Sequence, residues 1–328
     1  MNIQQINEIV DNYLIPDTCK DIGYHEREYY WLIEGDNFFY KIYKPVKNSN
    51  FDFSTIEKRR NAINKELILN KRLANKIYNR IIAVKQITQE QNIEDNDDGK
   101  IIDYALVIKK TNPEHKLINL INTNEISLSH IDKIASKIAH FHSRARVIKN
   151  VFGITAFQQD LEQVLNFGEE IKTKYGNENL DFIKELIDYS NKYLNQNRNL
   201  LNDRTILGYI KDAHGAIIPE NIYLSENDVF ITDCEISEDS FRYIDVLNDI
   251  AALGMELDSL GFKEFSTAFY ESYLKYSKTE DNFRTRELYE YYKTYRALKS
   301  LTNQLQKGST ATQYLAILHK YEPEMINS

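Results

Sequence analysis

The prevailing hydrophobic periodicity of the chain changes near residue 110, and this change limits the folds open to it. Over the first third, apolar and polar residues alternate in short runs, which predicts strands. Beyond Pro113, apolar residues recur every three to four positions over long stretches, which predicts helices. Strands and helices segregated in this way are typical of the α+β class. We therefore predict a strand-rich N-lobe over residues 1–110 and a helical C-lobe over residues 111–328.

A hairpin in the N-lobe is expected to present a lysine on one face of a sheet. Residues 29–33 and 38–43 have strand character, and a Glu-Gly-Asp-Asn turn joins them. Side chains alternate between the two faces of a strand, so Lys41 and Tyr43 should share one face. Further strands are expected at 81–87 and 101–108, joined by an acidic surface turn over residues 89–100.

The helix that follows the hairpin carries a carboxylate within its apolar stripe. This helix is predicted over residues 54–73, and Ser54 with Glu57 gives it a capping-box pattern. Glu66 falls among its inward-facing apolar residues, where an unpaired carboxylate is costly. Lys41 on the preceding strand is the natural partner. The alternative is that Glu66 reaches solvent at the edge of the stripe.

Within the helical remainder, residues 207–236 again have strand character. Two short strands flank the polar turn 226–228, which predicts a small hairpin. The unit should present His214, Asn221 and Asp233 at one end of the ribbon. A His-Gly turn, an amide and a carboxylate at one place suggest a metal–phosphate site.

Long helices are predicted on either side of this hairpin. Ser129 should begin one whose apolar face includes His142, which we interpret as a core histidine rather than a ligand. A stripe of tyrosines and leucines in the last strong helix is likewise interpreted as core. The predicted helices are 3–14, 155–174, 180–201, 245–259, 262–277 and 284–306 in addition to those above.

Charge and composition exclude several classes of protein. The net charge of −8 argues against a broad nucleic-acid surface. No stretch approaches the ~20 apolar residues of a membrane span, and the N-terminal segment lacks the features of a secretory signal. Cys19 and Cys234 are far apart and lack metal-ligand spacing, which favours free thiols in a reducing cytoplasm.

The order of these features resembles a protein-kinase-like fold, and more closely the aminoglycoside phosphotransferase family. The catalytic loop of that family reads H-G-D-x-x-x-x-N, and residues 214–221 read HGAIIPEN. Several other stretches resemble the phosphotransferase-like domain of bifunctional proteins that also carry an ATP-binding P-loop domain; they are 40–46, 52–60, 104–107, 241–243 and 295–297. The resemblance covers about residues 25–305. No G-x-x-x-x-G-K-[ST] occurs in the chain.

The resemblance implies a nucleotide and a metal ion. Lys41 would hold the α- and β-phosphates of ATP and would be oriented by Glu66. Asn221 and Asp233 would hold Mg²⁺, which prefers such oxygen ligands. No glycine-rich G-x-G-x-x-G precedes Lys41, so a plain hairpin would cover the phosphates.

The resemblance also implies roles for residues around the nucleotide. The strand end from Leu106 to Ile108 would supply backbone contacts to adenine. His214 would be structural within its loop, and Asp245 would hold that loop in place. A small hydroxylated molecule would bind the helical lobe as acceptor.

Ala216 departs from the family pattern at the position of the catalytic Asp. Loss of a general base costs about 10²- to 10⁴-fold in rate, whereas nucleotide binding depends on other residues. Asp212 and Glu220 are the nearby carboxylates, and neither has the offset of the missing one. Three interpretations stay open: a phosphotransferase in inactivated or variant form, a nucleotide-binding pseudokinase that serves as scaffold or sensor, and AMP transfer on the same scaffold.

Overall fold

The structure is a computed structural model that describes residues 1–12, 14–17, 21–48, 51–85, 100–149 and 153–326. The chain forms two compact units. The first comprises Met1–Leu120 and Asn221–Asp239, and the second comprises Ile121–Glu220 and Ser240–Ser328. The hairpin after Asn221 thus groups with the strand-rich unit and not with the helical one, because its second strand packs against the long helix of the first unit. The first unit also extends to residue 120 rather than 110.

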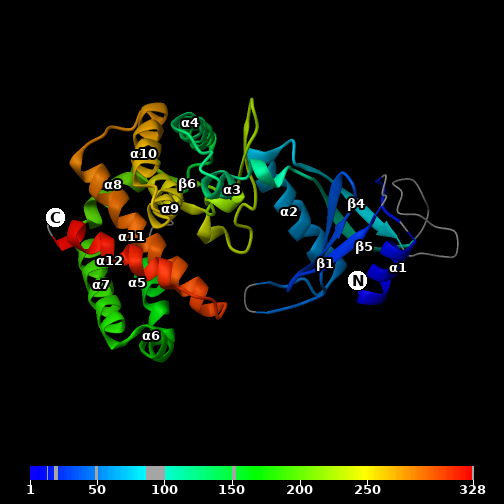
Figure 1. Cartoon of the computed structure of the whole chain (residues 1–328), viewed down its shortest axis with the longest axis horizontal. Helices are drawn as coiled ribbons and strands as arrows, with labels where there is room; N and C mark the ends of the chain where they lie inside the picture. The colour runs from blue at the N-terminus through cyan, green and yellow to red at the C-terminus, as the bar shows by residue number, and fades with distance from the viewer. Residues whose placement is uncertain (13, 18–20, 49–50, 86–99, 150–152, 327–328) are drawn as a thin grey trace. The chain divides into compact units, whose positions relative to one another are not determined.

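The first unit is built on an antiparallel sheet of five strands in the order β1-β2-β3-β5-β4. Strands β1, β4 and β5 of this sheet are labelled in Figure 1. Two helices pack on it, α1 on one face and α2 on the other. The strands are β1 (Gly23–Glu26), β2 (Tyr30–Glu34), β3 (Phe38–Tyr43), β4 (Tyr78–Lys85) and β5 (Ile101–Lys109), with the separate hairpin β7 (Ile222–Leu224) and β8 (Val229–Ile231). The helices are α1 (Ile3–Asp11), α2 (Ile56–Ala74) and α3 (Leu117–Asn122), with the short 3-10 turn η1 (Pro113–His115). The 3-10 turns η3 (Pro219–Asn221) and η4 (Asp239–Phe241) lie where the chain passes from one unit to the other.

The two faces of β3 belong to different cores, as its alternating pattern predicts. Tyr40 and Ile42 are buried in the core beneath α1. Tyr43 is buried in the core beneath α2, which also includes Ile63 of that helix. Lys41 shares the face of Tyr43 and therefore points towards α2.

Both predicted helix caps are displaced by one or two residues. Thr55, not Ser54, caps α2 and accepts a hydrogen bond from the amide of Lys58, while Ser54 bonds to Asp52. Ser127, not Ser129, caps the helix that contains His142. In each case a second hydroxyl residue lies within two positions, and the sequence pattern favours the wrong one.

The second unit is helical apart from one two-stranded ribbon, β6 (Ile210–Asp212) paired with β9 (Tyr243–Asp245). Helices α4 and α10 pack together, and α9 packs on both α10 and α11. The helices are α4 (Leu128–Arg144), α5 (Ile154–Glu162), α6 (Gly168–Tyr175), α7 (Asn177–Gln196), α8 (Arg198–Ile206), α9 (Val246–Ser259), α10 (Lys263–Ser277), α11 (Phe283–Gln306) and α12 (Thr312–Ile326), with the 3-10 turn η2 (Gln163–Phe167). Thus the α+β order is confirmed.

Two predictions about core residues are confirmed. His142 is buried, and its ring nitrogens hydrogen bond with the hydroxyl of Tyr273 at 2.8 Å and the carboxylate of Asp249 at 3.0 Å. The stripe along α11 is buried throughout: Leu288, Tyr291, Tyr292, Tyr295, Leu298 and Leu301. By contrast β1, α3, α12 and the ribbon β6–β9 were not predicted.

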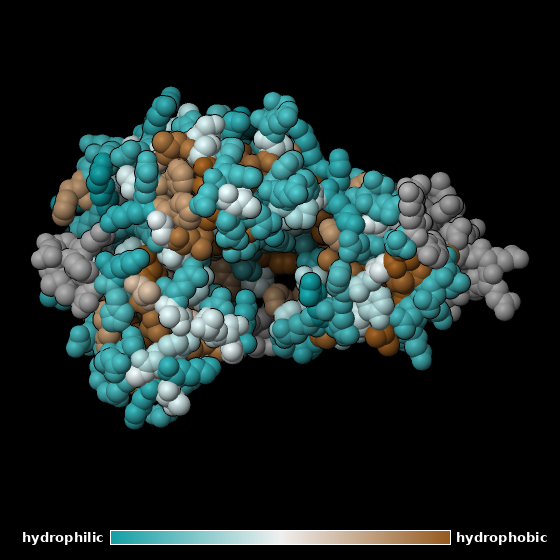
Figure 2. Space-filling model, viewed as in Figure 1, coloured by the Kyte–Doolittle hydropathy of each residue, from teal (hydrophilic) through white to brown (hydrophobic). Residues whose placement is uncertain are grey.

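The surface in view is mainly hydrophilic, and its hydrophobic residues form separate patches (Figure 2). Among the helices described, none has the length and apolar character that crossing a bilayer requires. Cys234 is buried, and its sulfur accepts a hydrogen bond from Arg72 at 3.2 Å. Cys19 and most of the predicted acidic turn at 89–100 lie outside the described residues.

A carboxylate in the core of the second unit predicts a pH-dependent stability. Glu256 of α9 is buried and accepts a hydrogen bond from Tyr314 at 3.0 Å. Burial raises the pKa of Glu256 to about 7, and Glu220 adds to the rise. The folded state therefore keeps a proton that the unfolded chain releases, so stability should fall as the pH rises from about 4.5 to 7.

We expect Glu256→Gln to be more stable than wild type at pH 8 by up to about 3 kcal/mol and about equal to it below pH 4.5. The amide keeps an acceptor for Tyr314 without carrying charge. Urea unfolding at the two pH values measures the difference, and Glu264→Gln on the exposed face of α10 is the matched control. An equal gain at both pH values would contradict the assignment.

Candidate functional site

The first unit contains a buried ion pair between Lys41 of β3 and Glu66 of α2, as predicted. The ammonium of Lys41 lies 2.8 Å from one carboxylate oxygen of Glu66, and the side chains are 13% and 3% exposed. The hydroxyl of Tyr43 donates to the other oxygen at 2.7 Å. Both oxygens of Glu66 are thus satisfied, so the alternative that Glu66 reaches solvent is wrong.

The charge on Lys41 is held in place by its surroundings. Burial acts to lower the pKa of Lys41, but Glu66 and the more distant charge of Asp233 raise it above its ordinary value. The ammonium also lies 4.3 Å from the centre of the Tyr30 ring, which favours a cation. Lys41 is therefore a fixed positive charge and not a general base.

The hairpin β7–β8 brings Asn221 and Asp233 to one end of the ribbon. The backbone carbonyl of Asn221 accepts a hydrogen bond from the amide of Thr232 at 2.8 Å, directly before Asp233. On the other side of Asp233, the amide of Cys234 donates to the side chain of Asn70 on α2 at 2.9 Å. These bonds fix the hairpin end against α2, so Lys41, Glu66, Asn221 and Asp233 all belong to one compact unit.

The carboxylate of Asp233 is poised to accept a stronger partner. It is exposed, and among the residues that the structure describes its oxygens accept from the hydroxyls of Tyr78 and Thr232, each at 3.3 Å. Its backbone adopts a left-handed conformation, with φ of 55°, which Asp tolerates better than most residues. Both donors are neutral and both bonds are long, so this exposed carboxylate can accept a cation.

The donor set at this end of the hairpin fits a magnesium ion. Mg²⁺ takes one or two protein oxygens and completes its octahedron with water and phosphate oxygens. Asp233 can supply a carboxylate oxygen and Asn221 an amide oxygen. The exposed carboxylate is the observation that favours a cation here.

The strand end predicted to contact adenine, from Leu106 to Ile108, lies inside the sheet. Strand β5 lies between β3 and β4, so Leu106 pairs with Lys41 on one side and Ile81 on the other. Ile108 likewise pairs on both sides. Their contact with adenine stays a prediction.

In the second unit, the loop that begins at His214 is held by Asp249 of α9. The carboxylate of Asp249 accepts from the amides of His214 and Gly215 at 2.9 and 2.8 Å, as well as bonding to His142. Burial opposes the charge of Asp249, but these partners lower its pKa to about 2. Gly215 has a φ of 84°, a conformation that a side chain would strain.

Asp245 does not have the predicted role. The carboxylate that holds the loop is Asp249, one helical turn further on. Asp245 instead caps α9 through the amide of Leu247 and forms a buried bidentate pair with Arg204. Asp245 is the N-cap of α9 and Asp249 lies four positions further along the helix. The prediction assigns the role to the wrong one of the two.

Ala216 continues the loop at the position of the expected proton acceptor. It is half-buried, and its amide donates to Nδ1 of the buried His214 at 3.4 Å, so His214 hydrogen bonds within its own loop. The possible substitutes are placed differently. Asp212 pairs with Arg242 and Arg146, and Glu220 is exposed.

Three residues at these sites were not assigned a role from the sequence. Tyr43 could be inferred, because it shares the strand face of Lys41. The role of Asp249 has no such signal in the sequence, because it depends on where the His214 loop lies relative to α9. Arg296 of α11, which donates to the carbonyl of Gly215 at 3.2 Å, lies in a stretch that was noted only for its resemblance.

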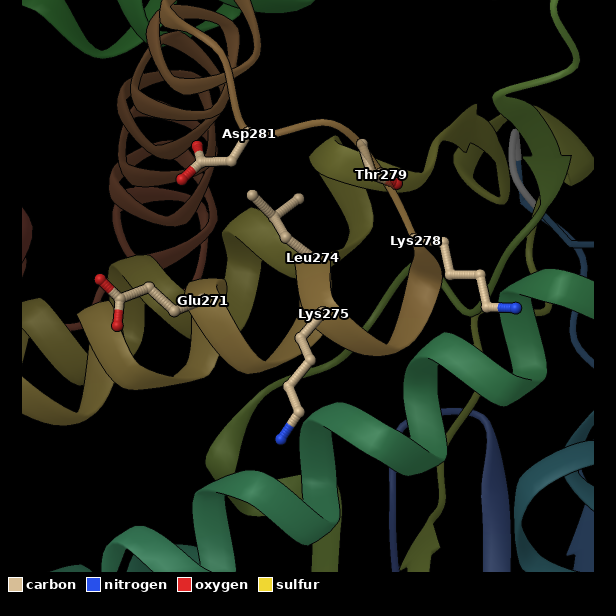
Figure 3. Close-up of a pocket in the computed structure, with 6 residues that line it drawn as sticks. All are labelled: Glu271, Leu274, Lys275, Lys278, Thr279 and Asp281. Carbon is tan, nitrogen blue, oxygen red and sulfur yellow. The ribbon is translucent and has the colours of Figure 1, made fainter.

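A shallow hollow at the end of α10 is a weak candidate for a site (Figure 3). Lys275 and Lys278 share its lining with Glu271 and Asp281, so the charges balance. These charged groups point in different directions and do not converge on one place (Figure 3).

Comparisons with known sequences find relatives of low identity. No family model matches it. An uncharacterized protein of Mycobacterium tuberculosis strain H37Rv is 25% identical over 274 residues, which cover 81% of this chain and 51% of that protein. The chain spans about half the length of the curated relatives it matches.

Comparisons with solved structures show the fold. A choline kinase from Cryptosporidium parvum Iowa II matches with a TM-score of 0.58 at 14% identity, covering 99% of this chain and 97% of that one. A choline/ethanolamine kinase family protein from Mesorhizobium loti matches at 0.55, with 12% identity and coverages of 99% and 94%. The GDP complex of an aminoglycoside 2'-phosphotransferase IIIa mutant also matches at 0.55, with 10% identity and coverages of 98% and 98%. The protein-kinase-like α+β fold is thus confirmed, while the bifunctional branch stays a prediction.

Proposed function

We propose that this chain binds ATP with Mg²⁺ and is a phosphotransferase, in a variant form, that acts on a small hydroxylated molecule. The observation that carries the proposal is the grouping of Lys41, Glu66 and Asp233 in one unit, with the lysine charge fixed and the aspartate carboxylate exposed. A cation at a phosphate and a carboxylate at its metal are the two charges that a nucleotide–metal complex requires. The shared fold with kinases supports the same conclusion.

Each residue would have a distinct part in binding. Lys41 neutralises phosphate oxygens, and Glu66 orients its ammonium. Asp233 and Asn221 hold the metal, which would neutralise charge on the phosphates when bound. The loop held by Asp249 presents position 216 towards the acceptor, and Ala there cannot accept a proton.

A second function is favoured by Ala216 itself. A chain that keeps the binding residues and lacks the proton acceptor can serve as a nucleotide-binding pseudokinase, in which ligand binding alone carries the signal. The two functions share nucleotide binding and differ in turnover.

Nucleotide binding is tested by replacing Asp233 with Asn. Mg-ATP at 100 times its dissociation constant should stabilise the wild type by about 2.7 kcal/mol, because only the folded state binds it. Asp233→Asn should weaken Mg-ATP at least about tenfold, while the unliganded stability changes little because this carboxylate is exposed. Thermal unfolding with ATP, with and without Mg²⁺, measures both.

Asp228→Asn, the same change in the same hairpin, is the matched control and should bind as wild type does. No stabilisation of wild type by Mg-ATP or Mg-GTP would refute the proposal. Stabilisation that is identical without Mg²⁺, or in Asp233→Asn, would remove the metal from it.

A further inference from the structure

A cavity of about 240 Å³ lies within the second unit, among α5, the start of α9 and α11. Aromatic rings form much of its wall, among them Phe157, Tyr243 and Tyr295. Its volume is below the ~300–1,000 Å³ of sites for drug-sized ligands, so it suits a small molecule. Arg296, which also lines it, donates to the carbonyl of Gly215 directly before Ala216, so the cavity lies beside that loop.

Arg296 brings a positive charge that its protein partners do not neutralise. Its Nε donates to the backbone and side-chain oxygens of Asn248, at 3.1 and 2.7 Å, and its Nη1 donates to Gly215. All three acceptors are neutral. Across the described part of the chain, these bonds leave N–H groups of the guanidinium unused, since arginine has five.

The other charges on the wall occur in pairs. Lys299 lies 3.0 Å from Asp160, which also accepts from the hydroxyl of Tyr295. Asp245 is paired with Arg204 behind the wall. The cations Arg296, Lys299 and Arg204 thus outnumber the carboxylates Asp160 and Asp245 by one. The first turn of α9, which carries Asn248, adds the positive end of a helix dipole.

We propose that this cavity binds a small organic anion, with its carboxylate or phosphate on Arg296 and its body against the aromatic wall. The planar fork of a guanidinium is suited to bidentate contact with such groups. An amine would meet a like charge at the same place. That the anion is the phosphoryl acceptor rests on the proposed function, whereas anion binding itself requires no phosphoryl transfer.

Matched ligands that differ only in charge test the proposal by calorimetry without nucleotide. One set is 4-hydroxyphenylacetate, 4-hydroxyphenethyl alcohol and tyramine, and the other is glucuronate, glucose and glucosamine. In at least one set the acid should bind at least tenfold more tightly than the alcohol, and the amine should bind most weakly. If neither acid binds more tightly than its neutral partner, or none binds at millimolar concentration, the proposal is overturned.

Two variants that each remove one charge should change acid binding in opposite directions. Arg296→Gln removes the uncompensated charge and should weaken it at least tenfold, whereas Asp160→Asn removes a carboxylate and should strengthen it about threefold. Lys275→Gln, in the hollow of Figure 3, removes a positive charge elsewhere and should have no effect. If Arg296 and Asp160 only held the cavity wall in shape, both variants should bind the acid more weakly than the wild type.

If Arg296→Gln does not fold, Asp160→Asn decides alone: unchanged or weaker binding of the acid refutes the proposal. The proposed function is judged separately by the thermal effect of Mg-ATP. Acid binding without nucleotide binding would retain this inference and reject that function.

Discussion

Replacing Ala216 with Asp is expected to raise the rate of phosphoryl transfer by about 10²- to 10⁴-fold, equivalent to about 3 to 5 kcal/mol of activation free energy. A carboxylate at this position can accept the proton of an acceptor hydroxyl as the oxygen attacks. The loop that carries it is already fixed, since Asp249 holds its first two amides and Arg296 holds the carbonyl of Gly215. The new side chain should therefore be well oriented. Nucleotide affinity should change little, because Lys41 and Asp233 are untouched.

ATP turnover with a panel of hydroxylated acceptors, including the acids that bind the cavity, measures the effect. Ala216→Asn is the control, because it has the size and polarity of Asp without its basicity. Transfer by Ala216→Asp alone supports a phosphotransferase with a replaced base. Background turnover in both variants, with Mg-ATP binding intact, supports the pseudokinase.

The parts of the site that depend on local patterns could be predicted from the sequence. Alternation in β3 gives the face of Lys41, and the apolar stripe of α2 gives the direction of Glu66, so their pairing follows from two periodicities and the cost of a buried charge. The strands of the hairpin β7–β8 follow from its polar turn. In each case a few neighbouring residues contain the necessary information.

The parts that depend on non-local pairing could not be predicted. Strands β6 and β9 have three residues each, too few for alternation to appear, yet their ladder joins Ile210 to Asp245 and fixes where α9 starts. Position Leu106 reads as a strand end in the sequence, while the order of strands in the sheet puts it between two neighbours. Strand order is a property of the whole sheet.

The error over Asp245 has a related cause. Nearly every residue of α9 is buried, so this helix shows no single apolar stripe from which to infer the direction of each side chain. Two acidic residues at its start are then equivalent in the sequence. Only the positions of Arg204 and of the His214 loop distinguish them.

The residues proposed to bind the nucleotide and the position proposed for proton transfer are therefore held in place by different elements. Lys41, Glu66 and Asp233 are fixed by the sheet, α2 and the hairpin of the first unit. Position 216 is fixed by Asp249 and by Arg296 in the second. A change in one set should leave the other measurable, which is why binding and turnover can be tested apart.

Asp249→Ala is expected to destabilise the second unit by about 3 to 5 kcal/mol and to release the His214 loop. The change leaves the buried amide of His214, the partly buried amide of Gly215 and one ring nitrogen of His142 without this acceptor, and the loss of a buried charged acceptor is costly. Asp203→Ala, on the exposed face of α8, should change stability by no more than about 0.5 kcal/mol. Urea unfolding gives the free energies, and hydrogen exchange at the amides of His214 and Gly215 reports on the loop.

The pH dependence of this loss distinguishes the carboxylate from simple packing. Because the pKa of Asp249 is lowered from 3.8 to about 2, its ionised form contributes stability that is fully present above pH 4 and declines as the pH falls towards 2. The wild type should therefore lose up to about 2 kcal/mol of its advantage over Asp249→Ala across that range. A difference that is constant with pH, or amides of His214 and Gly215 that stay protected in the variant, would show that Asp249 acts only by filling space. In that case the loop at Ala216 would be held by Arg296 and its own backbone, and the orientation assumed for Ala216→Asp would lose its main support.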